Sequence, residues 1–298
     1  MSLLLPENAR LIGQGITGSE GSRMLPWMLQ YGTQIVAGVT PGKGGQTVEG
    51  VPVFNSVAEA LERVGSCDGT VQFVPPMFTL GAVKEAIEAG LKWILIAAEK
   101  VPTKDTAIMY ALAKKHGVSI IGPSSVGYIC PAKKLKLGLI GGSDPNKVFA
   151  PGNIAVISKS GSMTAEISLG LKRAGLGNSI GVGIGGDRII GADFVDFLLE
   201  LEDDSQTLAS VIFGELGGTY EERVAEYVKS GKIKKPVVAF IAGEFTLSLP
   251  NEVQFGHAGA IIEGDRGKPS KKRQLLREAG VKVADNLDQI ADLVKQVI

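Results

Sequence analysis

The chain has 298 residues, and its 31 lysines and arginines balance 31 aspartates and glutamates, so the formal net charge at pH 7 is zero. This balance argues against nucleic acid or an anionic membrane as the main partner, because both attract proteins with a basic excess. The length exceeds that of one typical domain and predicts two, and 40 glycines predict many tight turns and close backbone approaches.

The ends and cysteines of the chain indicate where the protein works. The apolar run of residues 3–5 is short and has no basic residue before it, so we expect no signal peptide. No stretch approaches the ~20 apolar residues of a membrane helix. Cys67 and Cys130 follow no disulfide or metal spacing, which suits a reducing compartment. We therefore expect a cytoplasmic protein without a membrane partner and without a metal site of its own.

In the first half, short apolar runs alternate with longer helical patterns, which is typical of βαβ units and a mostly parallel sheet. A turn-rich stretch rich in glycine and proline then follows, and we interpret residues 126–152 as a connection between domains. The predicted strands cover residues 10–14, 34–39, 70–74, 93–97 and 118–121, with helices between them, for example over 80–89 and 103–116.

The second half repeats this rhythm, so the predicted fold class is α/β with two doubly wound domains, over residues 1–125 and 153–298. Its predicted strands cover 154–158, 180–184, 208–213, 237–241 and 281–283. Its predicted helices cover 164–173, 193–202, 220–229, 271–279 and 287–297.

A glycine motif follows the first predicted strand. Residues 13–18 read G-Q-G-I-T-G and fit G-x-G-x-x-G, which lets a pyrophosphate approach a helix N-terminus. A plain tight turn is the alternative. An NAD site has an acidic residue after the next strand, where this chain has Lys43 in a glycine-rich loop. The lysine suits a phosphorylated ribose, as found in NADP and in coenzyme A. Residues 74–78 then form either a wall for adenine or pantetheine, or a rigid turn.

His257 is one of only two histidines, and it lies between Gly256 and Ala258. Small neighbours leave its imidazole accessible, and a neutral imidazole can form covalent intermediates. A loop histidine without chemistry is the alternative. The other histidine, His116, ends a helical pattern and is interpreted as a cation at a helix C-terminus.

Two more glycine turns, in residues 158–164 and 214–219, lead from predicted strands into helices. Helix N-termini stabilise phosphate, and the carboxyl ends of parallel strands share one sheet edge. We therefore expect these turns beside His257, where a phosphoryl group would be stabilised. Glu215 could accept the other ring N–H, or it could be a surface carboxylate near a cap.

Five ordered segments carry a resemblance to a known family, the α subunits of the succinyl-CoA synthetase group. The resemblance implies a Rossmann-like domain that binds coenzyme A, followed by a flavodoxin-like domain in which His257 is transiently phosphorylated. It also implies a larger β subunit of the ATP-grasp type that holds ATP and Mg, in an αβ or α2β2 assembly. The segments are residues 14–18, 38–45, 183–187, 214–218 and 256–262.

The resemblance also implies roles for single residues. Glu215 is implied to hydrogen-bond His257. Contacts with coenzyme A are implied for Thr17, Gly18, Ser19, Glu20, Lys43, Ala97, Ala98 and Glu99, with Lys43 on a phosphate. Contacts with phosphate or the acid are implied for Ser160, Gly161, Ser162, Gly217 and Gly218.

Two departures from the succinate pattern concern the acid. Ala165 replaces a tyrosine that helps to bind succinate in the family, and Arg188 replaces a proline. A smaller residue and an added cation suit a larger tricarboxylate. Residues 160–163, 185–188 and 251–260 are more similar to ATP-citrate lyase, but the chain ends at Ile298 without that enzyme's lyase module.

The expected function is therefore that of the small subunit of a citrate–CoA ligase, a citryl-CoA synthetase. Ligases for succinate or malate are alternatives within the family. A CoA-binding regulatory protein without turnover and an NADP-dependent dehydrogenase are the alternatives from other classes.

Overall fold

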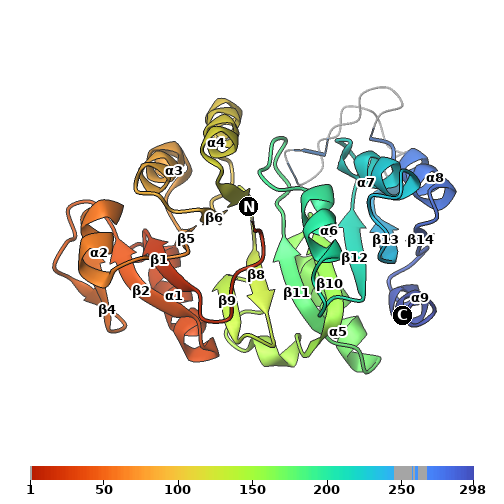
Figure 1. Cartoon of the computed structure of the whole chain (residues 1–298), viewed down its shortest axis with the longest axis horizontal. Helices are drawn as coiled ribbons and strands as arrows, with labels where there is room; N and C mark the ends of the chain where they lie inside the picture. The colour runs from red at the N-terminus through yellow and green to blue at the C-terminus, as the bar shows by residue number, and fades with distance from the viewer. Residues whose placement is uncertain (1, 245–256, 258, 261–266) are drawn as a thin grey trace.

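The computed structural model describes residues 2–244, 257, 259–260 and 267–298. These residues form two seven-stranded sheets, one in each half of the chain, with helices packed on them (Figure 1). The α/β fold class predicted from the alternation of apolar runs and helical patterns is thereby confirmed.

The first sheet has the strand order β3-β4-β2-β1-β5-β6-β7 and is parallel except for the β3–β4 pair. Its central strands are buried along almost their whole length because helices cover both faces, although only residues 93–96 form a continuous apolar run. The strands are β1 (Arg10–Gln14), β2 (Gln34–Val39), β3 (Thr47–Val48), β4 (Val51–Phe54), β5 (Gly69–Gln72), β6 (Trp93–Ile96) and β7 (Ser119–Ile121). The helices are α1 (Ser19–Tyr31), α2 (Val57–Val64), α3 (Thr79–Glu88) and α4 (Thr103–His116), with a 3-10 turn η1 (Pro76–Phe78).

The second sheet has the order β14-β13-β12-β10-β11-β8-β9. It is parallel from β14 to β11, and β8 and β9 add an antiparallel edge. The strands are β8 (Gly127–Cys130), β9 (Leu135–Gly138), β10 (Pro151–Ser158), β11 (Asn178–Gly183), β12 (Ala209–Gly214), β13 (Val237–Ile241) and β14 (Lys282–Val283). The helices are α5 (Gly161–Arg173), α6 (Phe194–Glu202), α7 (Tyr220–Lys229), α8 (Pro269–Glu278) and α9 (Gln289–Lys295), with a 3-10 turn η2 (Pro145–Lys147).

In each sheet, the order in which successive strands are added reverses at one strand. In the first sheet, β1 lies between β2 and β5, and in the second, β10 lies between β11 and β12. In open α/β sheets, ligands bind outside the carboxyl ends of the strands at such points. The loops after β1, β5, β10 and β12 are therefore where a ligand is expected.

Residues 126–152, which we interpreted as a connection between domains, include two strands of the second sheet. Residues 127–138 form the β8–β9 hairpin, which pairs with β11 and lies between the two halves (Figure 1). The side of β9 away from β8 contacts α1 of the first half, where the Thr33 hydroxyl donates to the backbone oxygen of Lys136 and accepts from its N–H. The Tyr128 ring packs edge-on against Trp93, with ring centroids 5.8 Å apart. The hairpin thus joins the halves in one structure.

The largest buried apolar cluster also runs through both halves, from Leu11 and Trp93 to Ile180 and Phe194. Burial on this scale stabilises the relative placement of the two sheets. Searched across the described residues, the structure contains no helix long and apolar enough to cross a membrane.

Candidate functional site

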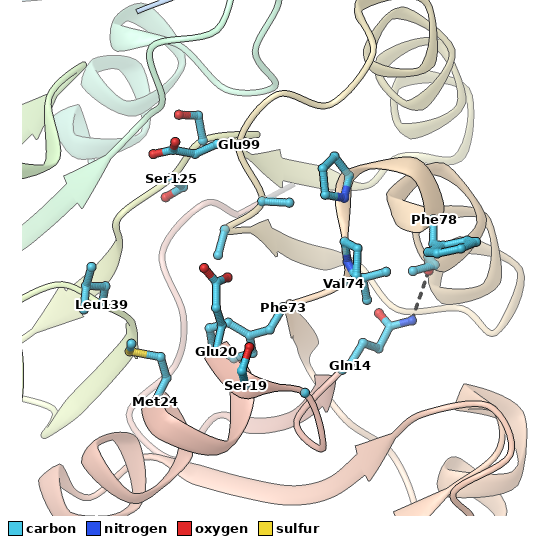
Figure 2. A pocket seen from close by; sticks show the side chains of 18 of the residues that line it. Gln14, Ser19, Glu20, Met24, Phe73, Val74, Phe78, Glu99, Ser125 and Leu139 are labelled. Atoms are coloured by element: carbon cyan, nitrogen blue, oxygen red, sulfur yellow. Dashed lines mark hydrogen bonds between the residues drawn. The ribbon is translucent and has the colours of Figure 1, made fainter. Parts of the chain in front are cut away.

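A cavity of about 1280 Å³ lies between the two halves. Its walls come from the carboxyl ends of β1, β2, β5 and β6, from the N-terminal turns of α1 and α5, and from His257. In Figure 2, Gln14, Val74 and Phe78 lie on one side, Glu20 and Phe73 near the centre, and Glu99, Ser125 and Leu139 opposite. The cavity therefore lies where the ligand sites expected at the edges of the two sheets adjoin each other.

The first glycine turn, residues 13–18, forms one wall. Gly15 has φ +81°, and a Cβ there would lie 2.8 Å from the backbone oxygen of Phe73, so only glycine fits. Gly18 is the N-cap of α1 and gives no side-chain hydrogen bond to the first turn. The amides at the start of α1 are thus available to an anionic ligand.

Behind this turn lies a hydrogen-bond network around Gln14, which is buried, and its only charged member is the half-buried Glu85, whose Oε2 accepts from the Gln14 amide at 3.4 Å. The Gln14 amide oxygen accepts from the Thr70 hydroxyl at 3.1 Å and from the Gln72 amide at 2.8 Å. Its amide nitrogen donates to the backbone oxygen of Ala82 at 3.1 Å. These bonds satisfy a buried amide and fix the end of β1 that leads into the turn.

The residues implied to contact coenzyme A lie in this wall with one exception. The exception, Lys43, is exposed and is not in the cavity lining, although Val39, Thr40 and Pro41 before it are. The lining residues of the predicted set are Thr17, Gly18, Ser19, Glu20, Ala97, Ala98 and Glu99.

The volume and chemistry of this part of the cavity fit coenzyme A. A glycine turn and an uncapped helix start suit its phosphates, while apolar Val74, Pro75 and Phe78 suit its adenine or pantetheine. Residues 74–78, for which we weighed a cofactor wall against a rigid turn, lead from β5 into η1, and four of the five line the cavity.

The opposite wall is the start of α5, where Ser160, Gly161 and Ser162 line the cavity. The Ser160 N–H donates to the Ser158 hydroxyl at 3.0 Å, and this hydroxyl donates to the Ser160 backbone oxygen. Ser160 is the N-cap of α5 but makes no side-chain cap bond. A second helix N-terminus with free amides therefore faces the same space as that of α1.

His257 lines the cavity between these walls. Its Nδ1 lies 2.8 Å from Glu215 Oε1, in the loop after β12, and the two side chains are 34% and 14% exposed. The hydrogen bond that His257 donates to the Glu215 carboxylate raises the pKa of His257, although burial acts in the opposite direction. Since Nδ1 is engaged by Glu215, Nε2 is the ring nitrogen that this contact leaves unengaged.

The imidazole packs against Gly186, in the loop after β11. A Cβ on Gly186 would lie 2.3 Å from the ring, so a side chain there would displace it. Asp187 follows, and burial together with the nearby charge of Glu99 raises the pKa of its carboxyl. His257 thus contacts the carboxylate of Glu215 and interacts electrostatically with Glu99, Asp187 and Lys159.

A buried ionic cluster lies beneath the second glycine turn, residues 214–218, and the sequence analysis did not find it. Its members are Lys159 (3% exposed), Glu221 and Lys272 (both 0%). Lys272 Nζ donates to Glu221 Oε2 at 2.5 Å, to Glu215 O at 2.8 Å and to Gly217 O at 2.6 Å. Lys159 Nζ lies 3.7 Å from Glu221 Oε1. Burial would raise the pKa of Glu221, but the two lysines outweigh it and lower that pKa.

Six predicted site residues lie outside the cavity lining, namely Lys43 and Glu215, already described, and the four that follow here. Gly217 and Gly218 form the left-handed turn before α7, with φ +80° and +60°, held by Lys272. Ala165 is half-buried in α5, and Arg188 is exposed in the loop after β11. The described residues therefore do not bring Ala165 and Arg188, on which the prediction of citrate depends, into the cavity itself.

The chain is similar to known proteins along most of its length. Residues 6–100 match the family of CoA binding domains, and residues 151–297 match the succinyl-CoA ligase like flavodoxin domain. A succinate–CoA ligase [ADP-forming] subunit alpha 2 of Archaeoglobus fulgidus is 44% identical over the whole of both chains. An ADP-forming sulfoacetate–CoA ligase subunit of an Acholeplasma species is 40% identical, covering 100% of this chain and 98% of that protein.

Solved structures extend the likeness to the whole described fold. The ATP citrate lyase of Methanosaeta concilii, solved with (3S)-citryl-CoA, has a TM-score of 0.91 at 28% identity. The match covers 99% of this chain but only 50% of that one, so this chain spans half of the solved protein's length. An acetyl-coenzyme A synthetase of Ca. Korarchaeum cryptofilum, at 20% identity and a TM-score of 0.76, shares the fold.

Proposed function

The chain belongs to the succinate–CoA ligase α-subunit family, whose α subunits work with a β subunit as acid–thiol ligases, and from this premise we propose its reaction and its acid. In the proposal, His257 carries a phosphoryl group from ATP to a citrate carboxylate, and coenzyme A then takes the acyl group. ATP and Mg are held by the β subunit, which we propose is of the ATP-grasp type. The observation that carries the proposal is the 2.8 Å contact between His257 Nδ1 and Glu215 at the wall of the cavity.

The geometry supports three balanced steps. Nε2 of the neutral imidazole attacks the γ-phosphorus of ATP, the bond to the leaving oxygen breaks, and ADP departs. A carboxylate oxygen of the acid then attacks the same phosphorus, and the P–N bond breaks to return the imidazole. Finally, the thiol sulfur of coenzyme A attacks the acyl carbon, and inorganic phosphate leaves with the thiol proton. Through all three steps, Glu215 holds the proton on Nδ1 and so keeps Nε2 as the reacting nitrogen.

Besides carrying the phosphoryl group on His257, this chain would bind and orient the reactants. The first glycine turn and the start of α1 would hold the phosphates of coenzyme A, with Thr17, Gly18, Ser19 and Glu20 beside them. The start of α5, with Ser160, Gly161 and Ser162, would receive the phosphoryl group or the acid. Lys43 is exposed next to the lining segment of β2, from which its long side chain could reach a phosphate at the rim.

For the acid, we propose citrate ahead of succinate. Ala165 lies one turn along α5 from the lining residues, and its small side chain leaves room beside them. Arg188 lies two residues after Gly186, against which the imidazole packs, and supplies a cation for a third carboxylate. Succinate is the second candidate, because relatives up to 44% identical carry that name.

The phosphoryl step is tested with γ-labelled ATP on the complex of this chain with the β subunit from the same source. We expect an acid-labile, base-stable label on the wild-type chain and none on His257→Asn. His116→Asn is a matched control, because His116 ends α4 and is not among the cavity residues, and it should keep the full label. Wild-type protein without label would overturn the proposal and favour a CoA-binding protein without turnover.

The acid is tested by turnover of the same complex with citrate, succinate, malate and sulfoacetate. Citrate should give the highest kcat/KM, and Arg188→Pro with Ala165→Tyr should shift preference toward succinate. If succinate is better in the wild-type complex, citrate is the wrong acid, and the phosphohistidine mechanism is unaffected.

A further inference from the structure

We propose that Lys159 is a phosphoryl-binding residue, whose ammonium contacts the anionic group that His257 carries. The inference rests on the proposed function, because it assigns a binding partner to the group transferred there. It concerns a residue inside the turn of residues 158–164 to which neither the sequence motifs nor the mechanism above gives a role. Three observations carry it, namely the position of Lys159, the charge of its cluster, and the charges around His257.

Lys159 is buried, yet it opens onto the cavity. It directly precedes Ser160 at the start of α5, its side chain is 3% exposed, and it lines the same space as His257. Its ammonium lies 3.7 Å from Glu221 Oε1 and over the Tyr220 ring at 5.5 Å. Neither contact is a hydrogen bond, and the ammonium donates none to the residues that the structure describes. A buried ammonium that borders a cavity and gives no hydrogen bond to the described residues can bind an acceptor that enters the cavity.

The three buried members of the ionic cluster are two cations and one carboxylate, and the half-buried Glu222 also acts on Lys272. Glu221 is already paired with Lys272 at 2.5 Å, and Lys272 gives its remaining hydrogen bonds to Glu215 O and Gly217 O. Lys159 is therefore a second buried cation on a carboxylate that already has one. Burial of a charge without a full partner is costly, and a dianion arriving in the cavity would relieve that cost.

The surroundings of His257 require such a cation. Glu215, Glu99 and Asp187 all act on the imidazole or lie beside it, and Lys159 is a cation whose charge acts on the ring. A phosphoryl group adds a charge of about −1.5 to −2 near neutral pH. Without a positive partner, this charge would be repelled by three carboxylates. Lys159, next to free amides at the start of α5, gives the phosphoryl group two sources of positive potential.

The test uses the full chain phosphorylated on histidine with phosphoramidate, which needs no β subunit. A ³¹P NMR titration measures the pKa of the phosphoryl group in wild type, Lys159→Met and Lys159→Arg. Loss of a contacting cation should raise this pKa by about one unit or more in Lys159→Met, and Lys159→Arg should stay near wild type. Lys229→Met, an exposed lysine at the end of α7, is the matched control and should not change it. Equal values in wild type and folded Lys159→Met would overturn the inference.

A second measurement avoids variants, in case Lys159→Met does not fold. If the phosphoryl group contacts Lys159, its amine is engaged, and phosphorylation should slow reductive methylation of Lys159 about tenfold. Lys229 should be methylated at an unchanged rate, and an unchanged rate at Lys159 would also overturn the inference. The two proposals fail separately. If the complex is labelled by ATP but the Lys159 effects are absent, only the proposal for Lys159 is wrong. If the Lys159 effects are present but ATP gives no label, only the ligase mechanism is wrong.

Discussion

The two glycine turns that border the site differ in what lies behind them. Both lead from a buried parallel strand into a helix without a side-chain cap, β1 into α1 and β12 into α7. The first turn is backed by the amide and hydroxyl groups of Gln14, Thr70 and Gln72. The second is backed by the buried ions Lys159, Glu221 and Lys272.

The difference matches what each turn would face during the reaction. A cofactor that binds and leaves with fixed charge needs a rigid cradle, which neutral hydrogen bonds provide without burying ions. A histidine that gains and loses a dianionic group needs nearby positive charge that does not move. By contrast, α6 lies outside the cavity lining, and Asp193 caps it with a full capping box. The uncapped starts of α1 and α5 border the cavity, where a ligand can take the place of the cap.

The largest effect in this comparison is expected from Lys272→Met. The substitution removes three hydrogen bonds and leaves Glu221 buried, with only Lys159 at 3.7 Å to balance it. We expect a loss of about 3–5 kcal/mol in the free energy of unfolding, measured in urea. Lys271→Met, next to it but exposed, should change stability by less than about 0.5 kcal/mol. A loss below about 1 kcal/mol for Lys272→Met would mean that the second turn does not depend on its ions.

Gln14→Leu is the matching change behind the first turn. It leaves the Thr70 hydroxyl and the Gln72 amide without their shared acceptor, in a buried place. The cost should be about 1–3 kcal/mol in the free energy of unfolding. It is smaller than for the ionic cluster, because the half-buried Glu85 loses only a 3.4 Å bond and keeps the N–H of Val57 as a donor. The comparison of neutral and ionic support fails if Gln14→Leu destabilises the protein as much as Lys272→Met does.

Sequence reasoning found the strands and helices whose patterns are local. The bounds of α4 were predicted to the residue, because Pro102 precedes the helix and Gly117 ends it with φ +68°. The β8–β9 hairpin was not predicted, since its strands have four residues each and lie among lysines, glycines and prolines that read as a loop. Its partner β11 lies far along the chain and gives no local signal.

The same distinction applies to the site. The glycine turns and the exposed imidazole of His257 are visible as short motifs. The ionic cluster is not, because Lys272 lies 51 residues from Glu221 and sits in the basic run of residues 271–273, which reads as exposed surface. Lys159 could have been noticed as a cation inside the turn before α5, although its burial could not. Around His257, residues 245–256, 258 and 261–266 lie outside the described residues.

Gly15→Ala tests whether the first turn must approach a ligand closely. A Cβ at Gly15 meets the Phe73 oxygen at 2.8 Å and also forces alanine into φ +81°. We expect about tenfold weaker binding of coenzyme A by calorimetry, since strain of 1–3 kcal/mol must distort the turn. Gly50→Ala is the matched control, because Gly50 has the same φ of +81° but nothing within 4 Å of its Cβ. It should lower stability slightly and leave the affinity for coenzyme A unchanged. Equal affinities for both variants would show that the close approach at Gly15 is not needed.

The smallest expected effect is a shift in the pH dependence of labelling. It tests whether the second glycine turn, through Glu215, tunes the pKa of His257, which the first turn does not contact. The hydrogen bond that His257 donates to Glu215 raises the pKa of His257, so the imidazolium persists to higher pH than in a free imidazole. Only the neutral ring can attack phosphorus, so the rate of ATP-dependent labelling should rise with pH through this raised pKa. In Glu215→Gln the pKa should fall toward its ordinary value of about 6.5, which moves the rising limb to lower pH.

The same substitution should lower the labelling rate on the high-pH plateau, because a neutral amide fixes the Nδ1 proton less firmly than a carboxylate does. The stabilisation that the pair gives the fold has the matching sign, since it is present at low pH and is lost as pH rises through the raised pKa. Glu226→Gln removes an exposed carboxylate from α7 without touching His257 and should leave the profile unchanged. Rates of labelling between pH 5.5 and 8.5 measure the limb. A limb that stays in place in Glu215→Gln would assign the raised pKa to Glu99 or Asp187, and the second turn would then act on the phosphoryl group without tuning the histidine.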